Sequence, residues 1–195
     1  MIVCIEGLTN SGKTSLCKAL NKNADYIFVN DKMKGNIVSE NIKKITNPLE
    51  NLGKFDYRTE LLLYCSMLSE KASIINMTGG NLIVDRFTLS VYAYFKARYN
   101  VDDEVLKQIV DFSSKKVIPD ITFFVDVPLN VILEHTVESP FSRKDVGIEE
   151  YYLAIRECYL KTIDRFSKKS YVLDGAKKSI EDIANEVNSI MKGMD

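Results

Sequence analysis

The fold of this 195-residue chain is indicated by one stretch near its start, Gly7-Leu8-Thr9-Asn10-Ser11-Gly12-Lys13-Thr14. An apolar run, residues 2–5, comes directly before this stretch, and a helix-like segment, residues 15–21, follows it. The spacing G-x-x-x-x-G-K-[ST] between a strand and a helix is that of a phosphate-binding loop. Glycines let the backbone turn sharply and bring successive N–H groups close to phosphate oxygens. The stretch therefore predicts a site for a nucleoside triphosphate, the alternative being an ordinary glycine turn between a strand and a helix.

The loop offers three kinds of contact to a triphosphate. Its backbone N–H groups and the N-terminal end of the following helix favour negative charge. Lys13 supplies a point charge for the β- and γ-phosphates, and the Thr14 hydroxyl is a ligand for Mg²⁺. The residues predicted to bind the nucleotide are Gly7, Thr9, Asn10, Ser11, Gly12, Lys13, Thr14 and Ser15.

The composition is that of an ordinary globular protein with one domain, residues 1–195. Hydrophobic residues make up 46% of the chain and charged residues 27%, and no linker or repeat interrupts it. The formal net charge of −1 and the scattered lysine pairs argue against a nucleic-acid partner. We find no signal peptide and no apolar run long enough to span a bilayer. These features predict a cytoplasmic protein without a membrane partner.

The cysteines and the histidine do not form a metal-binding pattern. Four cysteines lie far apart without a C-x-x-C pair, and His135 is the single histidine of the sequence. A zinc site is therefore not expected. Cys4, Cys17 and Cys65 stand among apolar residues and are expected to be reduced core residues.

Strands and helices are predicted to alternate along the whole chain. The expected strands are residues 2–5, 26–29, 81–85, 121–127 and 171–174, and the expected helices are residues 15–21, 38–45, 57–77, 86–98, 102–116, 128–135, 147–168 and 180–191. Ser179 is the expected N-cap of the last helix. The run 121–127 is continuously apolar, which is typical of a strand buried on both faces. This pattern predicts an α/β fold with a five-stranded parallel sheet flanked by helices on both faces.

The carboxyl ends of the strands are where ligands bind in an open parallel sheet. Asp85 and Arg86 follow the strand at 81–85, and Asn30, Asp31 and Lys32 follow the strand at 26–29. We therefore expect Asp85 to hold Mg²⁺, directly or through water, and Arg86 to grip a phosphate with its guanidinium fork. The alternative is that Asp85 only caps a helix and Arg86 is a surface residue.

Several motifs in the chain resemble those of thymidylate kinases. The run Asp85-Arg86-Phe87-Thr88-Leu89-Ser90-Val91-Tyr92-Ala93-Tyr94 matches that family's Asp-Arg-aromatic signature with its following Ser and Ala-Tyr. Further similarities lie at Ile5-Glu6-Gly7, at residues 119–128, and at Arg156 with Tyr159-Leu160. The resemblance extends over most of the chain.

The resemblance implies a P-loop kinase fold with a mobile lid, approximately residues 138–147, and transfer of the γ-phosphoryl group of MgATP to dTMP, which gives dTDP. Lys13 and Arg86 would stabilise charge on the transferring group, Arg143 would act as the lid arginine, and Thr14 and Asp85 would place Mg²⁺. Without the resemblance, the alternative interpretation of Arg143 is a positively charged loop residue exposed to solvent. Phosphoryl transfer needs positioning and charge neutralisation rather than a nucleophilic side chain. Family members are typically homodimers.

Three departures from the family pattern affect the acceptor half of the site. Thr9 stands where the family has an acidic residue, and Asn30-Asp31-Lys32 replaces an Arg-Glu-Pro-like sequence. Tyr64 keeps an aromatic that would stack on the base, or it is a core aromatic, and Leu68 replaces a base-reading arginine four residues later. The candidate acceptor contacts are Tyr64, Leu68, Arg86, Ser90 and Tyr94.

These departures leave two further hypotheses open. A deoxynucleoside kinase would need a carboxylate base for a free 5′-hydroxyl, and Glu6 and Asp85 are candidates for that role. A non-catalytic nucleotide-binding protein with a decayed acceptor site is the other alternative, against which the intact donor residues argue.

Overall fold

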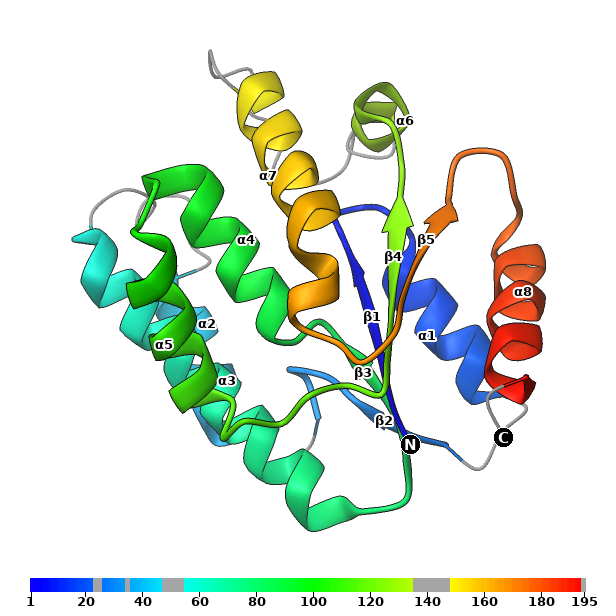
Figure 1. Cartoon of the computed structure of the whole chain (residues 1–195), viewed down its shortest axis with the longest axis horizontal. Coiled ribbons are helices and arrows are strands. Elements are labelled where there is room, and N and C mark those ends of the chain that lie inside the picture. The colour runs from blue at the N-terminus through cyan, green and yellow to red at the C-terminus, as the bar shows by residue number, and fades with distance from the viewer. Residues whose placement is uncertain (23–25, 34–35, 47–54, 135–147, 194–195) are drawn as a thin grey trace.

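The five strands found in the described residues form one parallel sheet. The computed structural model describes residues 1–22, 26–33, 36–46, 55–134 and 148–193. The strands are β1 (Ile2–Gly7), β2 (Tyr26–Val29), β3 (Asn81–Asp85), β4 (Ile121–Asp126) and β5 (Ser170–Asp174), in the order β2-β3-β1-β4-β5. All four pairings are parallel, so the loops that follow the neighbouring strands β1 and β3 lie next to each other at one edge of the sheet (Figure 1). The predicted α/β parallel sheet is confirmed.

Helices cover both faces of this sheet. On one side α1 (Lys13–Asn21) packs against α8 (Ile180–Lys192). The other side carries α3 (Tyr57–Thr78), α4 (Thr88–Tyr99), α5 (Asp103–Ser113) and α7 (Ile148–Thr162), while α2 (Ile37–Thr46) packs on α3 and the short α6 (Leu129–Glu134) on α7 (Figure 1). The predicted lid, residues 138–147, lies outside the described residues.

Strand β4 is the centre of the core. Ile121, Phe123 and Phe124 are fully buried because successive side chains of a strand point to opposite faces and helices cover both. The ring of Phe124 stacks on Tyr159 of α7 with centroids 4.8 Å apart, and Phe123 stacks on Tyr171 of β5 at 5.6 Å. The apolar run therefore forms a strand buried on both sides, as its sequence predicts.

Several helix boundaries differ from the sequence prediction, most clearly the start of α4 and the end of α7. Helix α4 begins at Thr88 rather than Arg86, because Arg86 adopts a left-handed backbone conformation with φ 62° and Phe87, with φ −146° and ψ −136°, is not helical either. Helix α7 ends at Thr162, and a single 3₁₀ turn, Ile163–Arg165, follows it. Ser179 caps α8 as predicted, in a capping box with Asp182.

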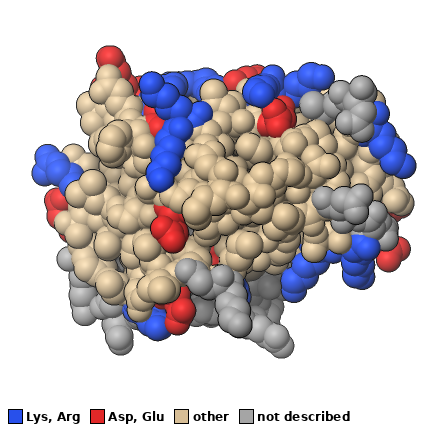
Figure 2. All heavy atoms as spheres, turned by 90° about the horizontal axis from the view of Figure 1, so that it is seen from below, with Lys and Arg blue, Asp and Glu red and all other residues tan. Residues whose placement is uncertain are grey.

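The face at the amino ends of the strands presents charges of both signs. Figure 2 shows basic and acidic side chains of the described residues dispersed on this face, mostly towards its margins. Within the described ranges, no helix combines the length and the hydropathy that crossing a bilayer requires.

Candidate functional site

The turn after β1 depends on two glycines. A Cβ at Gly7 would lie 2.4 Å from the Ser11 hydroxyl oxygen and 3.1 Å from the carbonyl oxygen of Val125, so no larger residue fits there. Gly12 has φ 81°, a conformation that glycine adopts without steric cost. Helix α1 begins at the next residue, Lys13, so its free N–H groups face the inside of the loop.

The remaining loop residues complete this turn. Thr9 is half-buried, Asn10 has φ 64°, and Ser15 is exposed in the first turn of α1. The Ser11 hydroxyl is buried and has no hydrogen-bond partner among the described residues. A polar group in that position is available for a ligand oxygen.

Lys13 is a buried ammonium inside the loop. Its Nζ donates a hydrogen bond to the carbonyl oxygen of Leu8 at 3.1 Å. Burial lowers the pKa of Lys13 to about 7, and the neighbouring Arg86 guanidinium adds to this effect. The site therefore concentrates positive charge that a polyphosphate would neutralise.

Thr14 and Asp85 meet across the sheet. Because Ile5 of β1 pairs with Asp85 of β3, the carboxylate lies opposite the start of α1, and the Thr14 hydroxyl donates to its Oδ2 at 2.8 Å. The other oxygen, Oδ1, is buried without a hydrogen-bond partner among the described residues. A hydroxyl and a carboxylate are hard oxygen donors, and an unpaired carboxylate oxygen beside a triphosphate loop fits Mg²⁺.

Arg86 lies at the same edge of the sheet. Its backbone N–H donates to the carbonyl oxygen of Ile5 at 3.1 Å, and its Nη1 donates to the Ser90 hydroxyl at 3.4 Å. Burial opposes the charge of this guanidinium, but nearby Tyr159, Glu6 and Asp85 outweigh it and raise the pKa of Arg86. The side chain is held as a cation beside the phosphate loop.

Glu6 anchors the turn that carries Arg86, a role that the sequence prediction missed. The residue is 0% exposed, its Oε1 accepts from the Phe87 N–H at 2.8 Å, and its Oε2 accepts from the Ser90 hydroxyl. Ser90 in turn lies 2.8 Å from the Tyr159 hydroxyl. Ser90 is thus engaged on several sides, and its contact with an acceptor stays a prediction.

An aromatic cluster stands between α3 and α4. The rings of Tyr64 and Tyr94 stack with centroids 5.5 Å apart, and the Tyr94 hydroxyl donates to Glu60 Oε1 at 2.8 Å. The guanidinium of Arg98 lies over the Tyr94 ring, 5.5 Å from the ring centroid. Leu68, by contrast, is 3% exposed and belongs to the hydrophobic core. Tyr64 and Tyr94 are half-buried and pack against the core, so their contact with an acceptor base stays a prediction, as does the role of Leu68.

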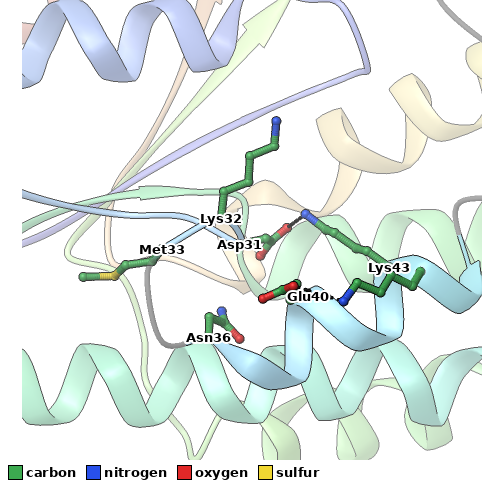
Figure 3. A pocket seen from close by; sticks show the side chains of 7 residues that line it. Asp31, Lys32, Met33, Asn36, Glu40 and Lys43 are labelled. Carbon is green, nitrogen blue, oxygen red and sulfur yellow. Dashed lines mark hydrogen bonds and ion pairs between the residues drawn. The ribbon is translucent and has the colours of Figure 1, made fainter.

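A pocket of about 410 Å³ opens between the end of β2 and α2. Figure 3 shows the ion pair between Lys43 and Asp31, with the Lys43 nitrogen 2.9 Å from Asp31 Oδ2, whereas the side chain of Lys32 extends away from this pair. Asn36 is buried, and its side-chain nitrogen has no hydrogen-bond partner among the described residues. The pocket thus offers an ammonium and an unpaired amide donor at the carboxyl end of a strand.

A buried lysine links this pocket to the phosphate site. Lys71 of α3 is 5% exposed and forms an ion pair with Asp31 at 2.6 Å. Burial alone would raise the pKa of Asp31, but the ammonium groups of Lys71 and Lys43 outweigh it and bring that pKa to about 2. Neither Lys71 nor Asp31 was among the predicted site residues. Arg143, which was, lies outside the described residues.

Comparison with known proteins identifies the family of this chain. The family model described as thymidylate kinase matches residues 5–187. The chain belongs to the thymidylate kinase family. It is 30% identical over 199 residues to the thymidylate kinase of Fervidobacterium nodosum, with 96% of each chain covered. It is 26% identical over 203 residues to that of Thermosipho africanus, with 98% of each covered.

Solved structures show the same fold. The thymidylate kinase of Ehrlichia chaffeensis superposes with a TM-score of 0.74 at 22% identity, covering 98% of both chains. That of Candida albicans, whose structure is described as revealing the origin of broad substrate specificity, gives a TM-score of 0.71 at 19% identity. This comparison covers 98% of our chain and 91% of the other.

Proposed function

We propose that this protein is a nucleoside monophosphate kinase that transfers the γ-phosphoryl group of ATP to dTMP, giving ADP and dTDP. The observation that carries the proposal is the convergence of Lys13, the Thr14–Asp85 pair and Arg86 at the adjoining ends of β1 and β3. Membership of the thymidylate kinase family supports dTMP as the acceptor.

The donor half of the site acts by positioning and charge. The backbone N–H groups of the loop and Lys13 bind the β- and γ-phosphates, and Arg86 stabilises charge on the transferring group. Thr14 and Asp85 hold Mg²⁺, which neutralises phosphate charge when it is bound. Arg143 is proposed to add a further positive charge from the lid, residues 138–147.

The acceptor half is supported by two features that lie on either side of α3. The Tyr64–Tyr94 stack offers a planar apolar face to the base. Lys32 and the unpaired amide of Asn36 offer donors to an anionic group, in place of the arginine that family members carry after the second strand. Since a leucine replaces the base-reading arginine, we expect weaker discrimination among pyrimidine monophosphates, by about 1–3 kcal/mol for each lost contact.

The test is ADP formation with Mg²⁺ against a panel of nucleosides and nucleoside monophosphates, with Lys13→Met as the blank. Turnover stimulated by dTMP supports the proposal, and comparable rates with other pyrimidine monophosphates would extend the acceptor range. Stimulation by free nucleosides alone would favour a deoxynucleoside kinase. ATP binding without any stimulated turnover would make the protein a non-catalytic nucleotide-binding module.

The geometry of Glu6 argues against this residue as the base that a nucleoside kinase would need. A free 5′-hydroxyl needs a carboxylate that can receive its proton. Glu6 is fully buried, and both of its oxygens already accept hydrogen bonds from Phe87 and Ser90. A monophosphate does not need such a base, because its oxygens are already ionised at neutral pH.

Two broader expectations accompany this function. We propose a homodimer, supported by apolar side chains exposed on α3 and α5, among them Leu62 and Phe112. We also propose a cytoplasmic location, which the four free cysteines support, because thiols persist in reducing compartments.

A further inference from the structure

Lys71 is a buried lysine in an unusual position on α3. Tyr64, Leu68, Lys71 and Ile75 follow one another at helical spacing, so the lysine lies on the helix face that packs into the core. A lysine is almost never fully buried unless it is paired. Its surroundings must therefore account for a buried positive charge.

Each of the three N–H donors of this ammonium has one acceptor. Lys71 Nζ donates to the carbonyl oxygen of Asp85 at 3.0 Å, to that of Arg86 at 2.9 Å, and to Asp31 Oδ1 at 2.6 Å. An ammonium has three donors and no acceptor, so its hydrogen-bonding capacity is completely used. Asp31 supplies the compensating charge, and the two carbonyls are those of the turn after β3.

That turn holds a strained residue. Arg86 has φ 62°, and a non-glycine residue keeps such a conformation only where its surroundings determine it. Its N–H is fixed by Ile5, and the N–H of the next residue is fixed by Glu6. Lys71 fixes the carbonyl groups on both sides of the Arg86 α-carbon, so the peptide units around this residue are held from β1 and from α3.

From these contacts we propose that Lys71 is a positioning residue: it holds the left-handed turn at Arg86 and thereby directs the Arg86 guanidinium towards the phosphate loop. The proposal rests on the proposed function, in which Arg86 stabilises the transferring phosphoryl group. Lys71 does not touch the reacting atoms and acts through Arg86. Asp31 holds the ammonium in place and ties the end of β2 to the same turn.

The kinetic test is a double-mutant cycle between Lys71→Met and Arg86→Ala. Methionine keeps the apolar stem of the lysine and removes its donors. We expect Lys71→Met to lower kcat tenfold to a hundredfold, the range for a misplaced catalytic group, with the KM for ATP within threefold of wild type. In the Arg86→Ala background, measured at high enzyme concentration, the same change should lower kcat by less than twofold. Equal losses in both backgrounds, or an unchanged kcat in the single variant, would overturn the proposal.

Two matched variants separate positioning from charge and packing. Lys71→Met/Asp31→Asn removes the carboxylate that the single change leaves short of a partner. If Lys71 positions Arg86, kcat stays low in this double variant. Recovery of kcat to within twofold of wild type would show that Lys71 only balances the charge of Asp31 and would contradict the proposal. Lys96→Met removes a part-buried lysine that donates to the carbonyl oxygen of Val101 and pairs with Asp103, both at 3.1 Å, and should leave kcat within twofold.

A spectroscopic readout does not depend on turnover. The Arg86 Nε–H signal of the ¹⁵N-labelled protein, assigned by its loss in Arg86→Ala, should shift and broaden in Lys71→Met and stay in place in Lys96→Met. An unchanged signal in Lys71→Met contradicts the proposal even if dTMP proves not to be the acceptor. Wild-type protein without kinase activity contradicts the proposed function and leaves this readout intact. Lys71→Gln replaces the methionine variant if the latter does not fold.

Discussion

We expect Lys13 to couple nucleotide binding to proton binding. Its pKa is lowered from the ordinary 10.5 to about 7, first by burial and then by Arg86. Between these two pH values the unfolded chain holds a proton on Lys13 that the folded chain has lost. The free energy of unfolding therefore rises with pH across this window, because a charged Lys13 in the folded state is costly and its neutral form is not. A bound triphosphate reverses the balance, since its charge favours the ammonium.

We therefore expect MgATP binding at pH 8 to take up protons. At this pH the terminal phosphate is already fully ionised, so the proton must enter the protein. Isothermal titration calorimetry in buffers of different ionisation enthalpy measures the uptake as a slope. The slope should be positive for wild type and close to zero for Lys13→Met. A wild-type slope of zero would mean that Lys13 is fully charged before the nucleotide binds.

Asp85 carries the second prediction at this scale. Asp85→Asn keeps the shape of the side chain and an oxygen that accepts from Thr14, but it removes the negative charge that we propose holds Mg²⁺. We expect kcat to fall at least tenfold, and the Mg²⁺ concentration for half-maximal activity to rise, a loss of about 1.4 kcal/mol or more. Titration of activity with MgCl₂ at fixed ATP measures both effects.

The control is a carboxylate at the opposite end of the sheet. Asp120 accepts from the Ile2 N–H at 2.7 Å and pairs with Lys168. Asp120→Asn should affect stability and leave the Mg²⁺ dependence unchanged. If Asp85→Asn showed the same Mg²⁺ dependence as wild type, Asp85 would not be a ligand of the metal.

At the scale of elements, the strands and most helices could be predicted because their signals are local. The apolar run of β4 and the capping serine of α8 are examples in which neighbouring residues alone determine the structure. The start of α4 is different. Arg86 is held outside the helix by Glu6 and Lys71, which lie 80 and 15 residues away in the sequence. No local pattern contains that information.

The same distinction applies to the candidate site. The phosphate loop and the Asp85–Arg86 pair were predicted because each is a short motif at the end of a strand. Lys71 was missed, and the anchoring roles of Asp31 and Glu6 were not predicted, because the partners of these residues come from different elements. One signal was available in the sequence: Lys71 interrupts the apolar face of α3, and a lysine on such a face needs a buried partner.

The cap of α8 gives a prediction for an element that lies behind the phosphate loop. The Ser179 hydroxyl accepts from the Asp182 N–H at 3.1 Å, and the Asp182 carboxylate accepts from Ser179 in return. Ser179→Ala should lower the free energy of unfolding by about 1 kcal/mol. Urea unfolding followed by circular dichroism measures the change, and kcat should stay within twofold of wild type.

Ser189 provides a matched control on the same helix. Its hydroxyl donates to the Asn185 carbonyl oxygen at 2.9 Å in the helix interior, where alanine is a good helix former. Ser189→Ala should change the free energy of unfolding by less than about 0.5 kcal/mol. Equal losses in the two variants would mean that the capping box contributes no more than any exposed serine.

For the whole molecule, the exposed apolar residues of α3 and α5 are candidates for an interface. These two helices pack against each other, and large apolar side chains remain exposed on both: Leu62, Met77, Val105 and Phe112. Phe112 is 85% exposed. Exposed aromatic and aliphatic side chains are common at interfaces between proteins. The partner that the family resemblance suggests is a second copy of the chain.

We therefore expect the wild-type protein to have twice the mass of one chain in size-exclusion chromatography with light scattering. Phe112→Lys places a charge on this surface, and burying it in an interface would be costly, so this variant should have the mass of a single chain. Val172→Lys is the control, because Val172 is also exposed but lies on β5, a strand at the edge of the sheet. This second variant should keep the mass of wild type. Dissociation by both changes would point to general destabilisation, and a single-chain mass for wild type would show that these apolar residues face solvent.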